Sequence, residues 1–396
     1  MSDPLVYIIA GEPSGDILAA RLIRALKHLT GGRVRFAGIG GEAMRAEGLP
    51  SLFPQADLAV MGFAEVVPRI PKILRRLQET LADIEAKRPA LIVTVDSWGF
   101  TGRVAKKLKE AGSTIPRLHY VAPMVWAWKE KRAKSLARYV DRLLCLLPNE
   151  PAYFARHGLK AVHVGHSVLE RLDEPGDGQG FRRRHGIAAD TPLLCVLPGS
   201  RTSETSRLLP IFAETAALMA GRFPGLQVVV PSVETVAEQV RRVVSGWRVP
   251  AVVVDSAEKW DAFAASDAAL AASGTVALEL AVSKVPMVIG YRVAAMTAAI
   301  ARRLLTIKYV CLLNLLLDRL MVPELLQERC VPADLAKELS PLMRDGPERR
   351  LQLAGCAEAL RALGVDGEAP SLRAAREALS MMRTESGTTS VSMTDL

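Results

Sequence analysis

The sequence predicts an α/β protein built from two consecutive domains with parallel sheets, a cleft between them and helices at the C-terminus. Short apolar runs alternate with helical patterns along both halves of the chain, as in βαβ units. Several of these runs end in a Gly-containing loop that opens a helix, which is typical of the ligand edge of an α/β sheet. The chain has 396 residues, 49% of them apolar and 23% charged, so it is long enough for more than one core.

The first half begins with an apolar run over Val6–Ala10, which predicts a buried strand. A polar turn over Gly11–Asp16 follows, and helical spacing then continues over Ile17–His28. Two carboxylates in this turn, Glu12 and Asp16, suit hydroxyl binding or proton abstraction, whereas Ser14 and Asp16 could also simply cap the helix. Further strands are predicted at Arg33–Ala37, Leu91–Val95, Arg117–Val121, Leu143–Leu147 and Ala161–Val164.

A stretch rich in glycine and charge separates the two halves. We interpret residues 170–186 as a linker, because this composition cannot bury a core. The predicted domains are then 1–169 and 187–370, followed by a C-terminal helix and polar tail over 371–396.

The second half carries two loops that suit an anion. The buried strand Leu193–Leu197 ends in a loop with Gly199, Ser200 and Arg201, and the strand Ala268–Ala271 leads to Ser273, Gly274 and Thr275, with Glu279 a helical turn later. N–H donors from two neighbouring helix starts could grip a diphosphate, and a carboxylate could accept hydrogen bonds from ribose hydroxyls. The pattern therefore favours a nucleotide diphosphate as ligand. Other strands are predicted at Gln227–Val230, Ala251–Val254 and Val285–Gly290.

The net charge of +9 favours contact with phosphates, whether in nucleic acid, anionic lipid or a substrate. Residues 62–77 interleave apolar residues with four cations, and Met296–Leu320 is a second apolar segment with embedded cations. Both could lie on a membrane surface, although the first could equally be a helix packed on the sheet with its cations in water. No apolar run reaches the ~18 residues that span a bilayer.

The five cysteines are scattered and form no C-x-x-C pair, and the six histidines form no cluster, so we expect no metal site. With no secretory leader, the cysteine pattern indicates the cytoplasm. The cations are spread along the chain rather than gathered on one helix, which disfavours nucleic acid as a partner.

Blocks throughout residues 5 to about 330 resemble the lipid-A-disaccharide synthase family, in the family's order. They comprise Gly11–Asp16, Val60–Val66, His119–Pro123 with Val125–Trp128, Val164–His166, Leu197–Arg201 with Glu204, Ser273–Thr275 with Glu279, Pro286–Arg292, Asn314–Leu316 and Val322–Gln327.

The resemblance implies a glycosyltransferase with two Rossmann-like domains (GT-B), the nucleotide in the second and the acceptor in the first. It would be an inverting enzyme that joins UDP-2,3-diacylglucosamine to 2,3-diacylglucosamine 1-phosphate, giving UDP and the β-1,6 lipid A disaccharide 1-phosphate for lipopolysaccharide. No cofactor or metal is expected, and the enzyme would lie on the anionic inner face of the inner membrane. The implied substrate-binding residues are Gly11, Ser14, Gly15, Met61, Gly62, Pro123, Trp126, Gly199, Ser200, Arg201, Ser273, Gly274, Thr275, Glu279, Tyr291, Asn314 and Glu324.

The chain departs from the family pattern where a general base is expected. The family often has acid-x-Pro-acid-Phe here, but Gly99 replaces the second acid, and Met124 stands where serine is usual. Asp96, Glu12 and Asp16 remain as candidate bases, of which we favour Asp96. Alternatives are another GT-B sugar-nucleotide enzyme, such as an epimerase or a peptidoglycan-precursor transferase, and a basic nucleic-acid-binding protein.

Overall fold

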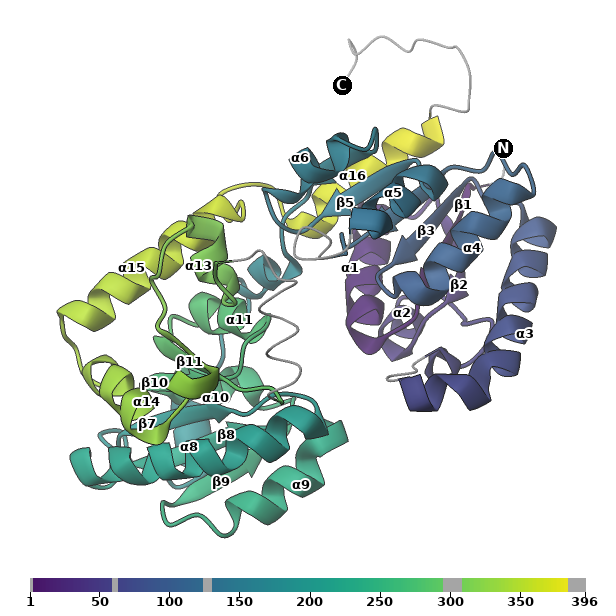
Figure 1. Ribbon diagram of the computed structural model, residues 1–396. Helices are drawn as coiled ribbons and strands as arrows, with labels where there is room; N and C mark the ends of the chain where they lie inside the picture. Colours follow the sequence, from purple (N-terminus) through teal and green to yellow (C-terminus); the bar gives the residue numbers. More distant parts are fainter. Residues whose placement is uncertain (1–2, 59–62, 124–129, 295–307, 384–396) are drawn as a thin grey trace. The chain divides into compact units, whose positions relative to one another are not determined.

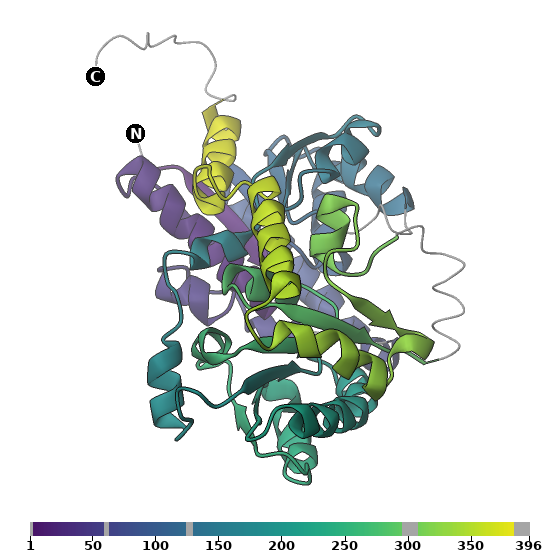
Figure 2. The ribbon, with the colours of Figure 1, turned by 90° about the vertical axis from the view of Figure 1, so that its left-hand side faces the viewer.

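The computed structural model describes residues 3–58, 63–123, 130–294 and 308–383, which form two compact units (Figure 1). One unit consists of Met1–Ser167 and Gly367–Leu396, and the other of Val168–Asp366. Each contains a parallel sheet of six strands with helices on both faces (Figure 2). No helix in the described ranges is both long and apolar enough to cross a membrane.

The sheet of the first unit has the strand order β2-β1-β3-β4-β5-β6. All predicted strands of this half occur, although the second begins and ends two residues later than predicted. Their bounds are β1 (Leu5–Ala10), β2 (Arg35–Ile39), β3 (Leu91–Val95), β4 (Arg117–Tyr120), β5 (Arg142–Cys145) and β6 (Lys160–His163).

Helices cover both faces of this sheet. One apolar cluster joins the sheet to α1 (Pro13–Thr30), α2 (Glu42–Ala46) and α16 (Pro370–Arg383). Another joins it to α3 (Phe63–Lys87) and α4 (Trp98–Glu110). The helices α5 (Glu130–Tyr139) and α6 (Glu150–Ala155) pack on the β5 side.

The C-terminal helix α16 belongs to the first unit. The predicted domain order treated this helix as a separate segment and did not include its return to the first domain. Its small residues Ala374, Ala375 and Ala378 are fully buried in the cluster that contains α1. Arg142 of β5 donates to the Glu377 carboxylate at 2.7 Å. The small-residue stripe allows a close approach of the helix, so the chain returns to complete the first domain.

The helix after β1 begins at Pro13, four residues earlier than predicted. Proline is well suited to the first helical position because its N–H would have no partner there. The segment from Pro13 to Asp16 is therefore the first turn of α1, and the loop itself is reduced to Gly11 and Glu12.

The second unit has the strand order β12-β11-β10-β7-β8-β9. Its bounds are β7 (Leu193–Leu197), β8 (Gln227–Pro231), β9 (Ala251–Val254), β10 (Ala268–Ala271), β11 (Met287–Tyr291) and β12 (Glu324–Leu326). The last strand was not predicted, because three residues are too few to show a period. The helices are α7 (Gly178–Arg184), α8 (Thr202–Arg222), α9 (Glu234–Val244), α10 (Lys259–Ala265), α11 (Val276–Val282), α13 (Leu312–Leu317), α14 (Pro332–Leu339) and α15 (Pro347–Ala362).

The prediction that residues 170–186 form a linker without a core is wrong. Residues 178–184 form α7, whose Phe181 is fully buried, and α7 packs on α10. Asp177 caps this helix by accepting the Gly180 N–H at 2.8 Å. A buried aromatic ring and a helix cap thus occur in a segment whose average composition is that of a linker.

Both strand orders contain a point where consecutive connections leave in opposite directions along the sheet. It falls between β7 and β10 in the second unit and between β1 and β3 in the first. Open α/β sheets bind ligands outside the carboxyl ends of the strands at such a switch point. The topology therefore directs attention to four loops, those after β1, β3, β7 and β10.

Candidate active site

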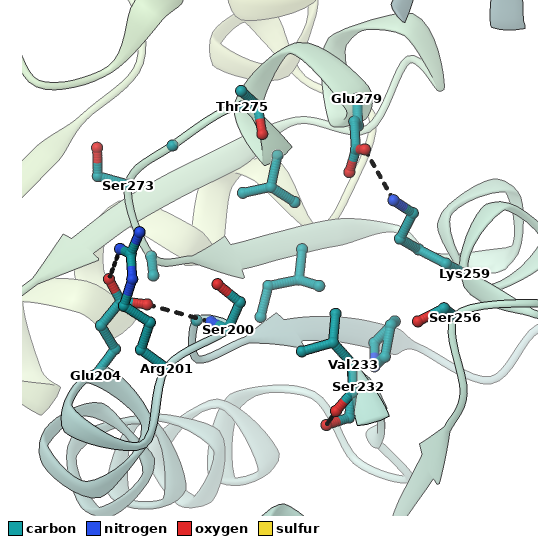
Figure 3. Close-up of a pocket in the computed structure, with 16 residues that line it drawn as sticks. Ser200, Arg201, Glu204, Ser232, Val233, Ser256, Lys259, Ser273, Thr275 and Glu279 are labelled. Carbon is teal, nitrogen blue, oxygen red and sulfur yellow. Dashed lines mark hydrogen bonds and ion pairs between the residues drawn. The ribbon is translucent and has the colours of Figure 1, made fainter. Parts of the chain in front are cut away.

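A pocket of about 370 Å³ lies at the carboxyl edge of the second sheet (Figure 3). It collects the six predicted residues of the β7 and β10 loops together with Glu279 from α11. These are Gly199, Ser200, Arg201, Ser273, Gly274, Thr275 and Glu279. The pocket therefore occupies the switch point between β7 and β10.

The loop after β7 is held by one carboxylate, that of Glu204 in the first turn of α8. Its Oε2 accepts the Ser200 N–H at 3.2 Å, and its Oε1 lies 3.2 Å from the Arg201 guanidinium. Gly199 has φ +106°, and a Cβ there would meet Glu204 Oε2 at 2.5 Å, so only glycine fits. The Tyr291 hydroxyl also donates to Glu204 Oε1 at 3.0 Å. Burial, followed by the nearby Glu204 charge, raises the pKa of Tyr291 to about 12.

The loop after β10 turns at Gly274, whose φ of +143° favours glycine. Ser273 Oγ donates to the Val310 carbonyl at 3.1 Å, which fixes the loop from outside the pocket. Thr275 occupies the N-cap position of α11. One turn later, Glu279 accepts a charge-assisted hydrogen bond from Lys259 at 2.8 Å.

Sequence reasoning missed the residues that line the far wall, Lys259, Ser256 and Ser232. Figure 3 shows Lys259 and Glu279 on one side of the pocket and Arg201 with Glu204 on the other. Ser232 and Ser256 follow β8 and β9, whose carboxyl ends reach the same edge. Their position after predicted strands was the only signal in the sequence, because no local motif indicated that these residues would line a binding pocket.

The pocket combines N–H donors, hydroxyls, two basic side chains and the carboxylate of Glu279. Arg201 offers positive charge to an anion, while the Glu279 carboxylate, paired with Lys259, suits a ligand with hydroxyl groups. The described ranges contain no group of three or more His, Cys, Asp or Glu side chains arranged to hold a metal ion.

Three predicted binding residues of the second half do not line this pocket. Tyr291 supports Glu204, as described above. Asn314 Nδ2 donates to Glu324 Oε1 at 2.7 Å, and Asn314 Oδ1 accepts the Val322 N–H at 2.8 Å. Glu324 Oε2 in turn accepts the Val310 N–H at 2.9 Å. The geometry thus gives Asn314 and Glu324 a structural role behind the β10 loop.

The first unit brings together side chains from the loops after β1 and β3. Ser97 Oγ donates to Glu12 Oε1 at 3.2 Å across the switch point. Gly11 permits this approach, since a Cβ there would lie 2.8 Å from both Cβ and Oγ of Ser97. Gly15 lies against the end of β3, where its hypothetical Cβ would meet the Val95 carbonyl at 3.5 Å.

Asp96 and Ser97 both adopt positive φ angles, +49° and +46°. Two consecutive non-glycine residues in the left-handed region are strained, and such strain is concentrated at functional sites. Within the described ranges, the Asp96 carboxylate has no hydrogen-bond or ion-pair partner, whereas its backbone carbonyl accepts from Thr101 Oγ1 at 2.8 Å. Asp96 as a whole is half-buried.

Asp16 is engaged in a different way. Its carboxylate accepts three backbone N–H groups at the start of α2, from Gly41 at 2.7 Å, Ala43 at 2.9 Å and Met44 at 3.1 Å. The residue is only 5% exposed. Asp16 therefore caps α2 rather than its own helix, and this geometry makes it a poor candidate for a base.

The remaining predicted residues of this half divide into two groups. Ser14 is exposed in the first turn of α1, and Pro123 is half-buried after β4. Met61, Gly62 and Trp126 lie outside the described residues. Position 99 is exposed at the start of α4, and a Cβ at Gly99 would meet no atom within 4 Å.

His119 supports the same edge from inside the sheet. Its Nδ1 lies 2.8 Å from Thr94 Oγ1, and its ring packs edge-on against Trp98 with centroids 4.9 Å apart. Complete burial lowers the pKa of His119 to about 3. The imidazole is therefore neutral at physiological pH and acts as a packing group.

Comparisons with known proteins place the sequence in one family. A family model described as lipid-A-disaccharide synthetase matches residues 6–367. The lipid-A-disaccharide synthase of Paramagnetospirillum magneticum is 58% identical, with 96% of this chain and 98% of that protein covered. The corresponding protein of Rhodospirillum centenum is 49% identical, with 96% of each chain covered.

Solved structures with similar folds are much more distant in sequence. A UDP-GlcNAc 2-epimerase from Neisseria meningitidis bound to UDP-GlcNAc has a TM-score of 0.62 and 11% identity, covering 96% of this chain and 100% of that one. MurG from Acinetobacter baumannii has a TM-score of 0.55 and 12% identity, covering 95% and 99%. At these identities the similarity indicates the GT-B fold alone.

Proposed function

The chain belongs to the lipid-A-disaccharide synthase family, and on that premise we propose how its two sheet edges divide the reaction. It is a GT-B glycosyltransferase of lipid A biosynthesis, with a sugar nucleotide as donor and a lipid-linked acceptor. The observation that supports the division best is the pocket at the β7/β10 switch point, with Arg201 and Lys259 beside Glu279.

We propose that this pocket binds the UDP of UDP-2,3-diacylglucosamine. Arg201 and the N–H groups of the β7 and β10 loops would hold the diphosphate, and Glu279 would accept hydrogen bonds from the ribose. Positive charge beside the diphosphate also stabilises it as a leaving group, because negative charge develops there in the transition state. This arrangement supplies the charge stabilisation from side chains and needs no metal.

The acceptor, 2,3-diacylglucosamine 1-phosphate, is proposed to bind at the β1/β3 edge of the first unit. Its 6-hydroxyl attacks the anomeric carbon of the donor, the bond from that carbon to the phosphate oxygen breaks, and UDP leaves with inversion. The hydroxyl proton passes to a base, for which Asp96 is best suited because its half-buried carboxylate has no partner in the described part of the chain. Glu12, hydrogen-bonded to Ser97, would orient the acceptor.

Membrane contact is proposed through one face of α3. Ile70 and Leu74 are 41% and 48% exposed, whereas Ile73 and Leu77 on the same helix pack into the core. The cations between them are largely neutralised, because Asp57 pairs with Lys72 and Arg76, and Glu79 with Arg75. The apolar face rather than the arginines would therefore carry the contact, on the cytoplasmic side of the inner membrane.

The reaction assay uses purified protein with both diacylated substrates dispersed in detergent and with a chelator present. We expect UDP and the disaccharide 1-phosphate in equal amounts. Arg201→Ala should lower kcat/KM by about 10²-fold or more, because it removes a charge that acts on the leaving group. Absence of UDP release from the wild-type protein would reject the proposed substrates.

A further inference from the structure

Four consecutive side chains at the start of α10 all have partners outside the helix. Glu258 lies 3.0 Å from His185 Nε2, Lys259 pairs with Glu279, and Trp260 packs under a cation. Asp261 Oδ1 accepts a backbone N–H at 2.7 Å. These contacts tie the N-cap residue and the first three residues of α10 to other parts of the second unit.

Most of these partners come from residues 171–185, which lie within the segment 170–186 predicted to be a linker. The Arg171 guanidinium lies 4.7 Å from the centroid of the Trp260 ring, and Arg184 donates to the Asp261 carboxylate at 2.6 Å. Gly176 approaches so closely that a Cβ there would lie 2.1 Å from the Trp260 carbonyl oxygen. The segment thus clamps α10 by charge, stacking and close backbone packing.

Lys259 is the one side chain of this turn that points into the nucleotide pocket (Figure 3). Its ammonium lies 2.8 Å from Glu279 Oε1 and 5.0 Å from the centroid of the Trp260 ring. Lys259 and Glu279 are 26% and 22% exposed, so their ion pair is partly shielded from water. Within the described chain Glu279 Oε2 has no side-chain partner, which leaves this oxygen for a ligand.

We propose that Lys259 is a positioning residue that holds the Glu279 carboxylate oriented to receive the ribose hydroxyls of the donor. The inference rests on the proposed UDP site. Without the ammonium, the partly buried carboxylate would lose its ion-pair partner and would rotate toward water. The contacts between residues 171–185 and α10 matter here, because Lys259 can orient the Glu279 carboxylate only if α10 itself is held in place.

The test compares the binding of UDP and of 2′,3′-dideoxy-UDP by isothermal titration calorimetry. The variants are K259M, K259R, E279Q and K259M/E279Q, with K106M as the control. Lys106 is also paired with a glutamate, Glu110 at 3.7 Å, but lies on the first unit. We expect K259M to weaken UDP binding about tenfold and dideoxy-UDP binding less than about twofold, because only the ribose contact is lost.

K259R should recover most of the UDP affinity, and the double variant should be no weaker than E279Q, since both substitutions remove one interaction. Equal weakening of both ligands in K259M would overturn the inference and indicate direct contact between Lys259 and the diphosphate. Unchanged binding in K259M would overturn it as well. If the wild-type protein binds no UDP, the proposed pocket itself is rejected, which separates that failure from the others.

Discussion

The two aspartates at the β1 and β3 edges offer a direct test of how the first unit works. Asp16→Asn replaces a carboxylate that accepts three backbone N–H groups by an amide that keeps one acceptor oxygen. If the amide oxygen of Asn takes the place of Oδ1, it can still accept the N–H groups of Gly41 and Met44. The amide NH₂ group then takes the place of Oδ2 and faces the Ala43 N–H, which loses its acceptor. Asp96→Asn changes a carboxylate without such partners in the described part of the chain and is tolerated at positive φ.

The expected magnitudes follow from these contacts. Hydrogen bonds to a charged group contribute about 1.5–3 kcal/mol each, and an unpaired buried donor costs about 1–3 kcal/mol. Allowing for the two weakened bonds, we expect Asp16→Asn to lower the free energy of unfolding by about 3 kcal/mol. For a unit of this size, that loss lowers Tm by about 6–12 °C. Asp96→Asn should change the free energy of unfolding by less than about 0.5 kcal/mol.

Turnover should show the opposite pattern. With calorimetry of the full chain and UDP release measured well below both transitions, Asp16→Asn should keep turnover within about threefold of the wild type. Asp96→Asn should lower it by about 10²-fold or more while UDP binding is unchanged. If Asp16→Asn abolishes turnover without lowering Tm, Asp16 is a catalytic residue and our interpretation of its three hydrogen bonds is wrong.

Three further predictions concern pH, a substituted family position and the membrane. Burial lowers the pKa of His119 to about 3, so between pH 6.5 and 5 the unfolded chain binds more protons than the folded one. The free energy of unfolding should therefore fall by up to about 1.4 kcal/mol per pH unit as pH decreases. Denaturant titrations at several pH values should show that the free energy of unfolding of His119→Asn depends less on pH than that of the wild type. An equal dependence on pH in both proteins would contradict this prediction. Gly99→Asp should raise Tm slightly in a thermal scan, because position 99 is open and an acid in the first turn of α4 is favourable; a lower Tm would mean that the site is not open. Ile70→Glu with Leu74→Glu should lower flotation with anionic vesicles at least severalfold, whereas the matched control Leu218→Glu, 43% exposed on the second unit, should not; equal loss in both would point away from α3.

Much of the fold could be predicted from the sequence because buried parallel strands are local apolar runs. The runs at Leu91–Val95, Leu193–Leu197 and Ala268–Ala271 were placed with the bounds that the structure has. The loops after β7 and β10 were also predicted as one ligand site, because glycine and hydroxyl residues directly follow these strands. The three-residue strand β12 and the early start of α1 escaped, since neither leaves a periodic signal.

Partners distant in the sequence were beyond such reasoning. Asp16 resembles a helix cap of α1 in the sequence, yet it caps α2 at Gly41, Ala43 and Met44. Lys259 is an ordinary surface lysine until α10 carries it to Glu279. Glu258, Trp260 and Asp261 form no recognisable motif in the sequence, because their contacts are made with residues 171–185, far from them along the chain.

By itself, the sequence determined the two α/β halves, the glycine-containing loops and the family. Each of these depends on apolar periodicity, on backbone angles that favour glycine, or on blocks in a fixed order. Only the tertiary structure decided which loops meet, because strand order fixes the switch points between β1 and β3 and between β7 and β10. The tertiary structure also distinguished the roles of Asp96 and Asp16. The Asp16 carboxylate accepts three N–H groups that the folded chain brings to it, whereas the Asp96 carboxylate has no such partners in the described part of the chain.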